Sequence, residues 1–177
     1  DAAVTAKYWV ERIAKISVDV DIASELRYRE TPMPKGGLAI FISQSGETAD
    51  TLAALRYCKK QGQKILSIVN VSESTIARES DSVLQTYAGP EIGVASTKAF
   101  TTQLTTLACL VVGLASSNGS ISIEIEAKLV KALTEVPARA AEVLNHDNYL
   151  KELAIKIAKS NDVLFLGRGT RYPIAME

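Results

Sequence analysis

The chain has 177 residues, of which 47% are apolar and 23% charged, a balance typical of a globular domain with a full core. Its 20 basic and 20 acidic side chains cancel, which argues against a nucleic-acid partner. The two cysteines, Cys58 and Cys109, lie in apolar helical patterns and indicate small core residues in a reducing compartment, so we expect a cytoplasmic protein. A lone histidine, His146, and the lack of paired cysteine spacing argue against a metal site.

No stretch of the sequence resembles a signal peptide, and the longest apolar run, Leu104–Ala115, is too short to cross a bilayer. We therefore expect no membrane partner. The sequence opens at Asp1 without a methionine and stops at Glu177, where a further helix begins. We expect a segment of a longer protein.

The first 37 residues predict a helix, a strand, a short helix and a loop. The first helix runs to about Ala14, and the alternation of Val18–Ile22 predicts a strand exposed on one side. Residues 23–28 indicate a short helix, and the prolines and glycines of residues 31–37 a loop. The residues expected on the buried face of the first helix are Val4, Tyr8, Trp9 and Ile13.

The stretch Ser43-Gln44-Ser45-Gly46-Glu47-Thr48 lies between a predicted buried strand, Leu38–Ile42, and a predicted amphipathic helix that ends near Gly62. A strand that turns into a helix leaves unpaired N–H groups at the helix start, beside the positive end of the macrodipole. Hydroxyls and N–H groups there can bind a phosphate or another anion. Serine and threonine are also ordinary helix N-caps, and the local sequence leaves both interpretations open.

The strands that follow predict the sheet. Ile65–Val69 is a second buried strand, Ser72–Thr75 begins a short helix through Glu79, and Ser82–Tyr87 is a further strand. Strands that alternate with helices predict a parallel α/β sheet, whose ligands lie at the carboxyl ends of the strands. The Ser43–Thr48 turn belongs to that edge.

A second turn, residues 88–96, precedes a long helix, and Ser96 and Thr97 stand at its start. N-capping explains these two hydroxyls equally well, but their place at the same sheet edge favours a shared pocket. Hydroxyls, an amide such as Gln44 and helix starts suit a sugar phosphate. The residues expected on the buried stripe of this helix are Phe100, Leu104, Leu107, Val111 and Leu114.

The last third of the chain predicts helices and one strand. Residues 116–120 are a flexible break, followed by an amphipathic helix that continues past Pro137 to about Leu144, then a helix over Leu150–Ile157. Val163–Leu166 predicts a strand before the glycine-rich turn Gly167–Arg171. That turn lacks the third glycine of a dinucleotide motif, and the sequence contains neither a P-loop nor a G-x-S-x-G elbow.

Two motifs together resemble a known family. Ser43-Gln44-Ser45-Gly46-Glu47-Thr48 followed by Glu91-Ile92-Gly93-Val94-Ala95-Ser96-Thr97-Lys98-Ala99-Phe100 is similar to the sugar isomerase (SIS) domain of the glutamine–fructose-6-phosphate aminotransferases, the glucosamine-6-phosphate synthases. Leu166–Gly169 with Tyr172–Glu177 resembles the start of that family's second SIS domain. The resemblance implies a flavodoxin-like three-layer α/β sandwich with a five-stranded parallel sheet, and an enzyme that is at least a homodimer.

The resemblance also implies the site residues. By motif, Ser43, Ser45 and Thr48 would bind the phosphate of fructose 6-phosphate with Gln44 beside them, and Val94 and Ser96 would contact the sugar. The family joins glutamine-derived ammonia to C2 of the opened sugar and isomerises the adduct to glucosamine 6-phosphate, a step of amino sugar biosynthesis. It uses no metal or organic cofactor.

Departures from the family pattern set limits. The family's Gly-Thr-Ser phosphate loop would precede Asp1, its catalytic lysine, glutamate and histidine would follow Glu177, and its glutaminase domain is missing. We therefore expect no catalytic residue in this chain, and no activity from it alone. The implied division is residues 1–118 as a first SIS domain without its first strand and loop, 119–160 as a helical connection, and 161–177 as the opening of a second SIS domain.

Two other functions remain open at this level: a phosphosugar-sensing SIS module of a transcriptional regulator, and a phosphosugar isomerase without a glutaminase domain. A helix-turn-helix in the flanking sequence would indicate the first. Glutamine-independent isomerisation would indicate the second.

Overall fold

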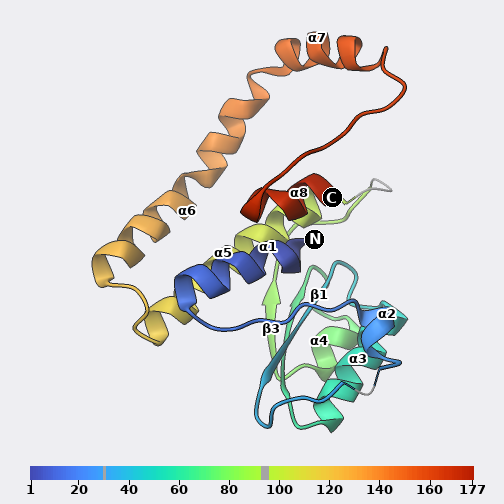
Figure 1. Cartoon of the computed structure of the whole chain (residues 1–177), viewed down its shortest axis with the longest axis vertical. Helices are drawn as coiled ribbons and strands as arrows, with labels where there is room; N and C mark the ends of the chain where they lie inside the picture. Colours follow the sequence, from blue (N-terminus) through green and yellow to red (C-terminus); the bar gives the residue numbers. More distant parts are fainter. Residues whose placement is uncertain (30, 93–95) are drawn as a thin grey trace.

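A parallel sheet with helices on both of its faces forms the body of the computed structural model (Figure 1), which describes residues 1–29, 31–92 and 96–177. Within that part of the chain the sheet has three strands in the order β1-β2-β3. Strand β2 pairs with β1 in the register Ile40↔Leu66 and with β3 in the register Ile68↔Leu84. The bounds are Leu38–Ser43 for β1, Lys64–Val69 for β2 and Ser82–Gln85 for β3.

Helices α3 (Ala49–Lys60) and α4 (Thr75–Glu79) connect these strands and cover one face of the sheet. Because both connections join parallel neighbours, the two strand–helix–strand units are the ones that the alternating pattern predicts. Between α3 and the sheet, Leu55 is completely buried. The buried residues of this core are Phe41, Ala54, Leu55, Cys58, Ile65, Val69, Ile76 and Ala77. Short helix α2 (Ala23–Leu26) packs against α3.

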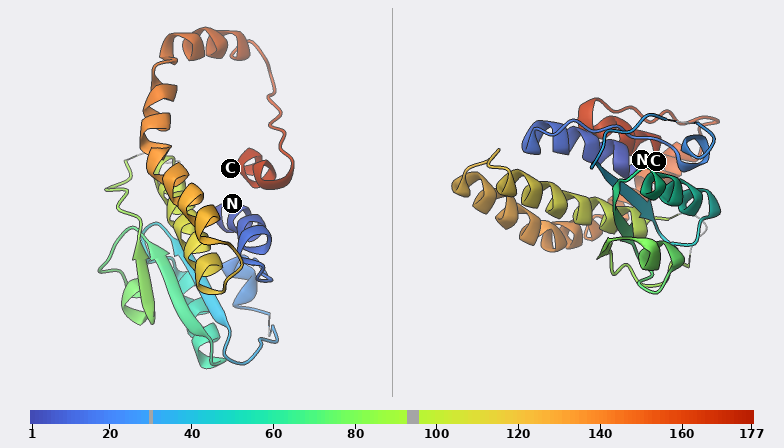
Figure 2. Two further views of the ribbon diagram at one scale, coloured as in Figure 1. Left: turned by 90° about the vertical axis from the view of Figure 1, so that its left-hand side faces the viewer. Right: turned by 90° about the horizontal axis from the view of Figure 1, so that it is seen from below.

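The other face of the sheet is covered by α1 (Ala2–Trp9) and α5 (Lys98–Ser117) (Figures 1 and 2). Ile68 of the central strand packs with Leu107 of α5 and with alanines of α1. Buried residues line both faces of β2, as expected for a central strand between two helical layers. The three-layer α/β architecture that the resemblance implies is confirmed, whereas the described residues form three of the five parallel strands that it implies.

The buried face of the first helix differs from the expected one. A stripe of small residues packs against α5, while Tyr8 is 39% exposed and Trp9 and Ile13 are half-buried. Small side chains allow the backbones of two packed helices to approach closely. Close packing against α5 therefore buries the small residues of the first helix and leaves its larger side chains partly exposed. The helix continues from α1 as a π-helical segment, Val10–Ala14, and the buried stripe is Ala2, Thr5, Ala6, Val10 and Ala14.

Helix α6 (Ile123–Leu144) and α7 (Asp147–Ile157) project from this body, and both have no buried residue among those the structure describes. The first part of α6 packs along α5, and the helix runs through Pro137 without ending there. The chain then returns through residues 158–168 to a 3-10 turn, Gly169–Arg171, and to α8 (Tyr172–Met176) beside α1.

Two expected strands do not form. Val18–Ile22 and Val163–Leu166 have no strand assignment, and the latter is 52–83% exposed. A strand needs a partner for its backbone groups, and the described residues offer none to either segment. Alternation and apolar character alone could not reveal this lack.

One expectation about helix α5 is corrected. Cys109 is exposed, because it lies on the face opposite the buried Leu107 and Val111, whereas Cys58 is buried as expected. The helix has 20 residues, and an 18-residue window within it has a mean hydropathy of 1.5, so by length and composition it could cross a membrane. Its apolar character has a simpler cause, because its buried face forms part of two core clusters with α1.

Candidate functional site

The turn after β1 organises its own hydroxyls. The buried Ser43 accepts a hydrogen bond at Oγ from the Gly46 N–H at 3.0 Å, and Ser45 accepts one at Oγ from the Glu47 N–H at 3.2 Å. A hydroxyl that accepts from the backbone keeps its own O–H free to donate. Both serines can therefore donate to a ligand from positions that the backbone fixes.

Helix α3 starts without a side-chain cap among the described residues. Thr48 is its N-cap residue, and its carbonyl accepts the first helical bond, from Leu52 at 3.0 Å. By contrast, α4 is capped by Ser74 Oγ, which accepts from Ala77 at 3.4 Å. The first N–H groups of α3 and the Thr48 hydroxyl are thus available at the positive end of the helix, where an anion is favoured.

The start of α4 supports the turn from behind. The Gly46 carbonyl accepts from the Ile76 N–H at 3.0 Å, and the Glu47 carboxylate accepts from the Thr75 N–H at 2.7 Å. This backbone hydrogen bond from Thr75 is the main cause that holds the pKa of Glu47 below its usual range. The charge of Glu47 is therefore directed at α4, not at the proposed ligand position.

Gly46 is required in this turn for two reasons. Its φ of +68° belongs to the left-handed region. A Cβ atom built on it would overlap the Cβ and Oγ atoms of Ser74. The glycine of the motif therefore allows the turn to touch α4.

The second predicted turn is only partly described. Val94 lies outside the described residues, and Ser96 is exposed, two residues before α5. Thr97 is the N-cap residue, with no side-chain cap bond within the described part of the chain. Instead, the Glu91 carboxylate accepts from the Ala99 N–H at 3.3 Å, a contact that sequence reasoning missed although Glu91 belongs to the second motif. Figure 1 shows that α5 begins beyond the carboxyl end of β3.

Asn70, at the carboxyl end of β2, links the two turns and was also missed. Its backbone N–H donates to the Gln44 carbonyl at 3.2 Å. Its side-chain Nδ2 donates to the Gly89 carbonyl at 2.7 Å, and its Oδ1 accepts from the Ala88 N–H at 2.8 Å and from Thr86 Oγ1 at 3.2 Å. Its position directly after the central strand is the sequence signal that could have identified it.

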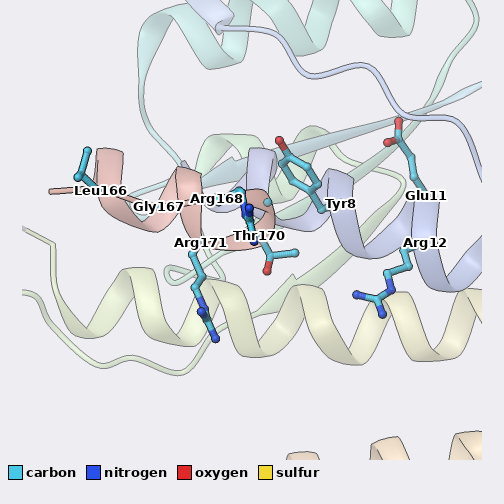
Figure 3. Close-up of a pocket in the computed structure, with 9 residues that line it drawn as sticks. Tyr8, Glu11, Arg12, Leu166, Gly167, Arg168, Thr170 and Arg171 are labelled. Carbon is cyan, nitrogen blue, oxygen red and sulfur yellow. The ribbon is translucent and has the colours of Figure 1, made fainter.

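A hollow of about 910 Å³ lies elsewhere, between the first helix and residues 166–171 (Figure 3). None of the six predicted site residues lines it. Most of the side chains that line the hollow are exposed, including those of Arg12, Arg168 and Arg171. The carboxylate of Glu11 also lines it, so the positive charge of the arginines is partly offset. We therefore place the candidate site at the Ser43–Thr48 turn, where the fixed hydroxyls and the open helix start coincide.

The fold and this turn together define an α/β protein with a parallel sheet between helical layers and a polar, open helix start at its carboxyl edge. The chain belongs to the SIS domain family, whose model matches residues 1–113.

Relatives are similar over nearly the whole chain. It is 58% identical over 176 residues to a glutamine–fructose-6-phosphate aminotransferase (isomerizing) of Bradyrhizobium diazoefficiens and 57% identical to one of Brucella abortus, covering 99% of this chain in each case. The chain spans 29% of the length of these relatives.

Solved structures agree with the fold. The C-terminal domain of glucosamine-fructose-6-phosphate aminotransferase from Francisella tularensis matches 98% of this chain and 49% of its own at 45% identity, with a TM-score of 0.95. A glucosamine-6-phosphate deaminase from Thermotoga maritima matches 77% of this chain and 41% of its own at 28% identity, with a TM-score of 0.64.

Proposed function

We propose that this chain is the phosphosugar-binding part of the isomerase region of an enzyme that makes glucosamine 6-phosphate from fructose 6-phosphate and glutamine. The observation that carries the binding proposal is the uncapped start of α3 beside the fixed hydroxyls of Ser43 and Ser45. The relatives at 57–58% identity, which are named for this aminotransferase, support the choice of reaction.

In this proposal each predicted residue has a separate task. Ser43, Ser45 and Thr48 donate hydroxyl hydrogen bonds to the phosphate, and Gln44 donates beside them. Ser96 and Val94 contact the sugar from the second turn. Hydrogen bonds to a charged group contribute about 1.5–3 kcal/mol each, so three of them account for binding of roughly micromolar strength without an arginine.

The reaction itself needs groups outside this chain. Opening of the sugar ring and proton transfer between C1 and C2 require acid–base residues, which we place in the remaining part of a longer protein. Ammonia from glutamine requires a glutaminase domain, which would be the partner of this region in the same polypeptide. We propose that residues 1–118 form the first SIS domain, 119–160 the connection and 161–177 the opening of a second one, and that the chain alone is inactive. The chemistry needs no metal or organic cofactor.

We further propose a cytoplasmic homodimer. Exposed apolar residues on α6, α7 and the returning segment, such as Leu144 at 75%, Phe165 at 73% and Leu166 at 83%, support a surface that other protein covers. The buried free thiol of Cys58 supports a reducing compartment.

Calorimetric titration with fructose 6-phosphate and glucosamine 6-phosphate tests the binding proposal. We expect Ser45→Ala and Thr48→Ala each to weaken binding about tenfold. Ser82→Ala is the matched control, because Ser82 is an exposed hydroxyl at the opposite, amino end of the sheet. No binding by the wild type, or equal losses in all three variants, would refute the proposed site.

Activity assays test the reaction. The full-length protein should form glucosamine 6-phosphate from fructose 6-phosphate only when glutamine or ammonia is supplied, and the 177-residue chain should form none. Phosphosugar binding without any synthesis by the full-length protein would instead favour a sensor module or a glutaminase-independent isomerase.

A further inference from the structure

Asn70 is the one side chain in the described residues that joins the segment after β3 to the end of the central strand through three hydrogen bonds. Its amide uses both of its ends. Nδ2 donates to the Gly89 carbonyl at 2.7 Å, and Oδ1 accepts from the Ala88 N–H at 2.8 Å and from Thr86 Oγ1 at 3.2 Å. The same residue binds the first turn through its backbone, at the Gln44 carbonyl.

The segment that Asn70 holds is strained. Tyr87 has a φ of +54°, which is uncommon for a residue with a side chain, and the ring itself is 81% exposed, so packing of the ring does not enforce this conformation. The two neighbours of Tyr87 are both bound by Asn70 Oδ1. A left-handed conformation of this kind persists when surrounding contacts determine it, and such positions gather at functional sites.

The path from Asn70 leads on to helix α5. Two residues after Gly89, the Glu91 carboxylate accepts from the Ala99 N–H in the first turn of α5. Hydrogen bonds therefore join the first turn to the end of β2, and the end of β2 to residues 86–89, while Glu91, two residues further along the chain, is bonded to the start of α5. The Asn70 amide therefore fixes residues 86–89 against the end of β2, beside the first turn.

We propose that Asn70 is a positioning residue: it fixes residues 86–89, which lead toward the proposed sugar contact at Ser96, relative to the phosphate-binding turn, and so makes the site prefer a phosphosugar to free phosphate. This inference rests on the function proposed above. Phosphate binding depends on the first turn, whose hydroxyls are set by its own backbone. In the proposed function, contact with the sugar involves Ser96, which follows the residues 86–89 that Asn70 fixes. Loss of the Asn70 amide should therefore weaken the protein's contact with the sugar and leave its binding of the phosphate unchanged.

The test compares two ligands in the full-length protein without glutamine. Affinity for fructose 6-phosphate is measured by calorimetry, and affinity for inorganic phosphate by its competition with fructose 6-phosphate. We expect Asn70→Ala to weaken fructose 6-phosphate binding about tenfold and to change phosphate binding less than about twofold. Thr86→Val, which removes one donor to the amide and keeps side-chain volume, should weaken fructose 6-phosphate binding about threefold and tests the inference should Asn70→Ala not fold.

Asn118→Ala is the matched control. The Asn118 amide also donates to a backbone carbonyl at 2.7 Å, that of Ala14, but at the end of the first helix. It should lower thermal stability as Asn70→Ala does and leave both affinities unchanged.

Three outcomes overturn the inference. Fructose 6-phosphate binding within about twofold of the wild type in Asn70→Ala, or in Thr86→Val if that is the folded variant, refutes it while the proposed function stands. Equal weakening of both ligands shows general damage to the first turn and refutes selective positioning. A wild-type protein that binds neither ligand refutes the proposed function, and the inference with it.

Discussion

Replacement of Gly46 by alanine should destabilise the chain more than any ordinary glycine replacement, because two separate costs coincide there. A residue with a Cβ atom at φ +68° costs about 1–2 kcal/mol relative to glycine. The new methyl group would also overlap Cβ and Oγ of Ser74 and would lie 3.5 Å from Val69 Cγ1. Overpacking of this kind costs about 1–3 kcal/mol, so we expect Gly46→Ala to lower the free energy of unfolding by about 3 kcal/mol.

Gly62→Ala separates the two costs. Gly62 has a similar φ of +78°, and no atom of the described residues would lie within 4 Å of its added Cβ. This variant should lose only the conformational part, about 1 kcal/mol. The difference between the two variants, about 2 kcal/mol, then measures the contact of the turn with α4.

Urea denaturation followed by circular dichroism provides the measurement, with the midpoint shift converted through a common slope. Ser74→Gly in the Gly46→Ala background should recover part of the loss, because it removes both overlapping atoms. If Gly46→Ala and Gly62→Ala cost the same within about 0.5 kcal/mol, the close contact between the turn and α4 does not exist and the reasoning fails.

Three further predictions concern the core, the thiols and the response to acid. Leu55→Ala should cost about 3–4 kcal/mol of unfolding free energy, because Leu55 is completely buried, whereas Leu150→Ala, at a side chain 46% exposed, should cost less than about 1 kcal/mol; equal losses in denaturation would contradict the core assignment. A maleimide should label the exposed Cys109 quickly and Cys58 only after unfolding, since burial shields Cys58 and raises the pKa of its thiol; fast labelling that survives Cys109→Ser would oppose this. The hydrogen bond from Arg56 lowers the pKa of Glu79, so the pair stabilises the fold above the ordinary glutamate range and loses this effect as the pH falls through the lowered pKa. Arg56→Ala should therefore reduce the melting temperature at pH 7 but not at about pH 2, and a constant difference across this range would refute the assignment.

The sequence predicted one half of the candidate site, the turn after β1, better than the other half, the segment before α5. The first turn is local: strand, serines, glycine and helix follow one another within a dozen residues, and the structure places Ser43, Gln44, Ser45 and Thr48 together at the end of β1. What those residues bind stays a prediction. The second half depends on long-range contacts, and for that reason the capping role of Glu91 and the linking role of Asn70 were missed.

The sequence by itself determined the α/β class, the parallel order of strands and helices over residues 38–85, and the place of the polar turn, because apolar periodicity and turn chemistry act over short distances. Only the tertiary structure decided which face of the first helix is buried, that Cys109 is exposed, and that Val18–Ile22 and Val163–Leu166 do not pair as strands. These outcomes depend on which partner surface is available, and a residue's own neighbours in sequence carry no information about a partner that lies far along the chain or outside it.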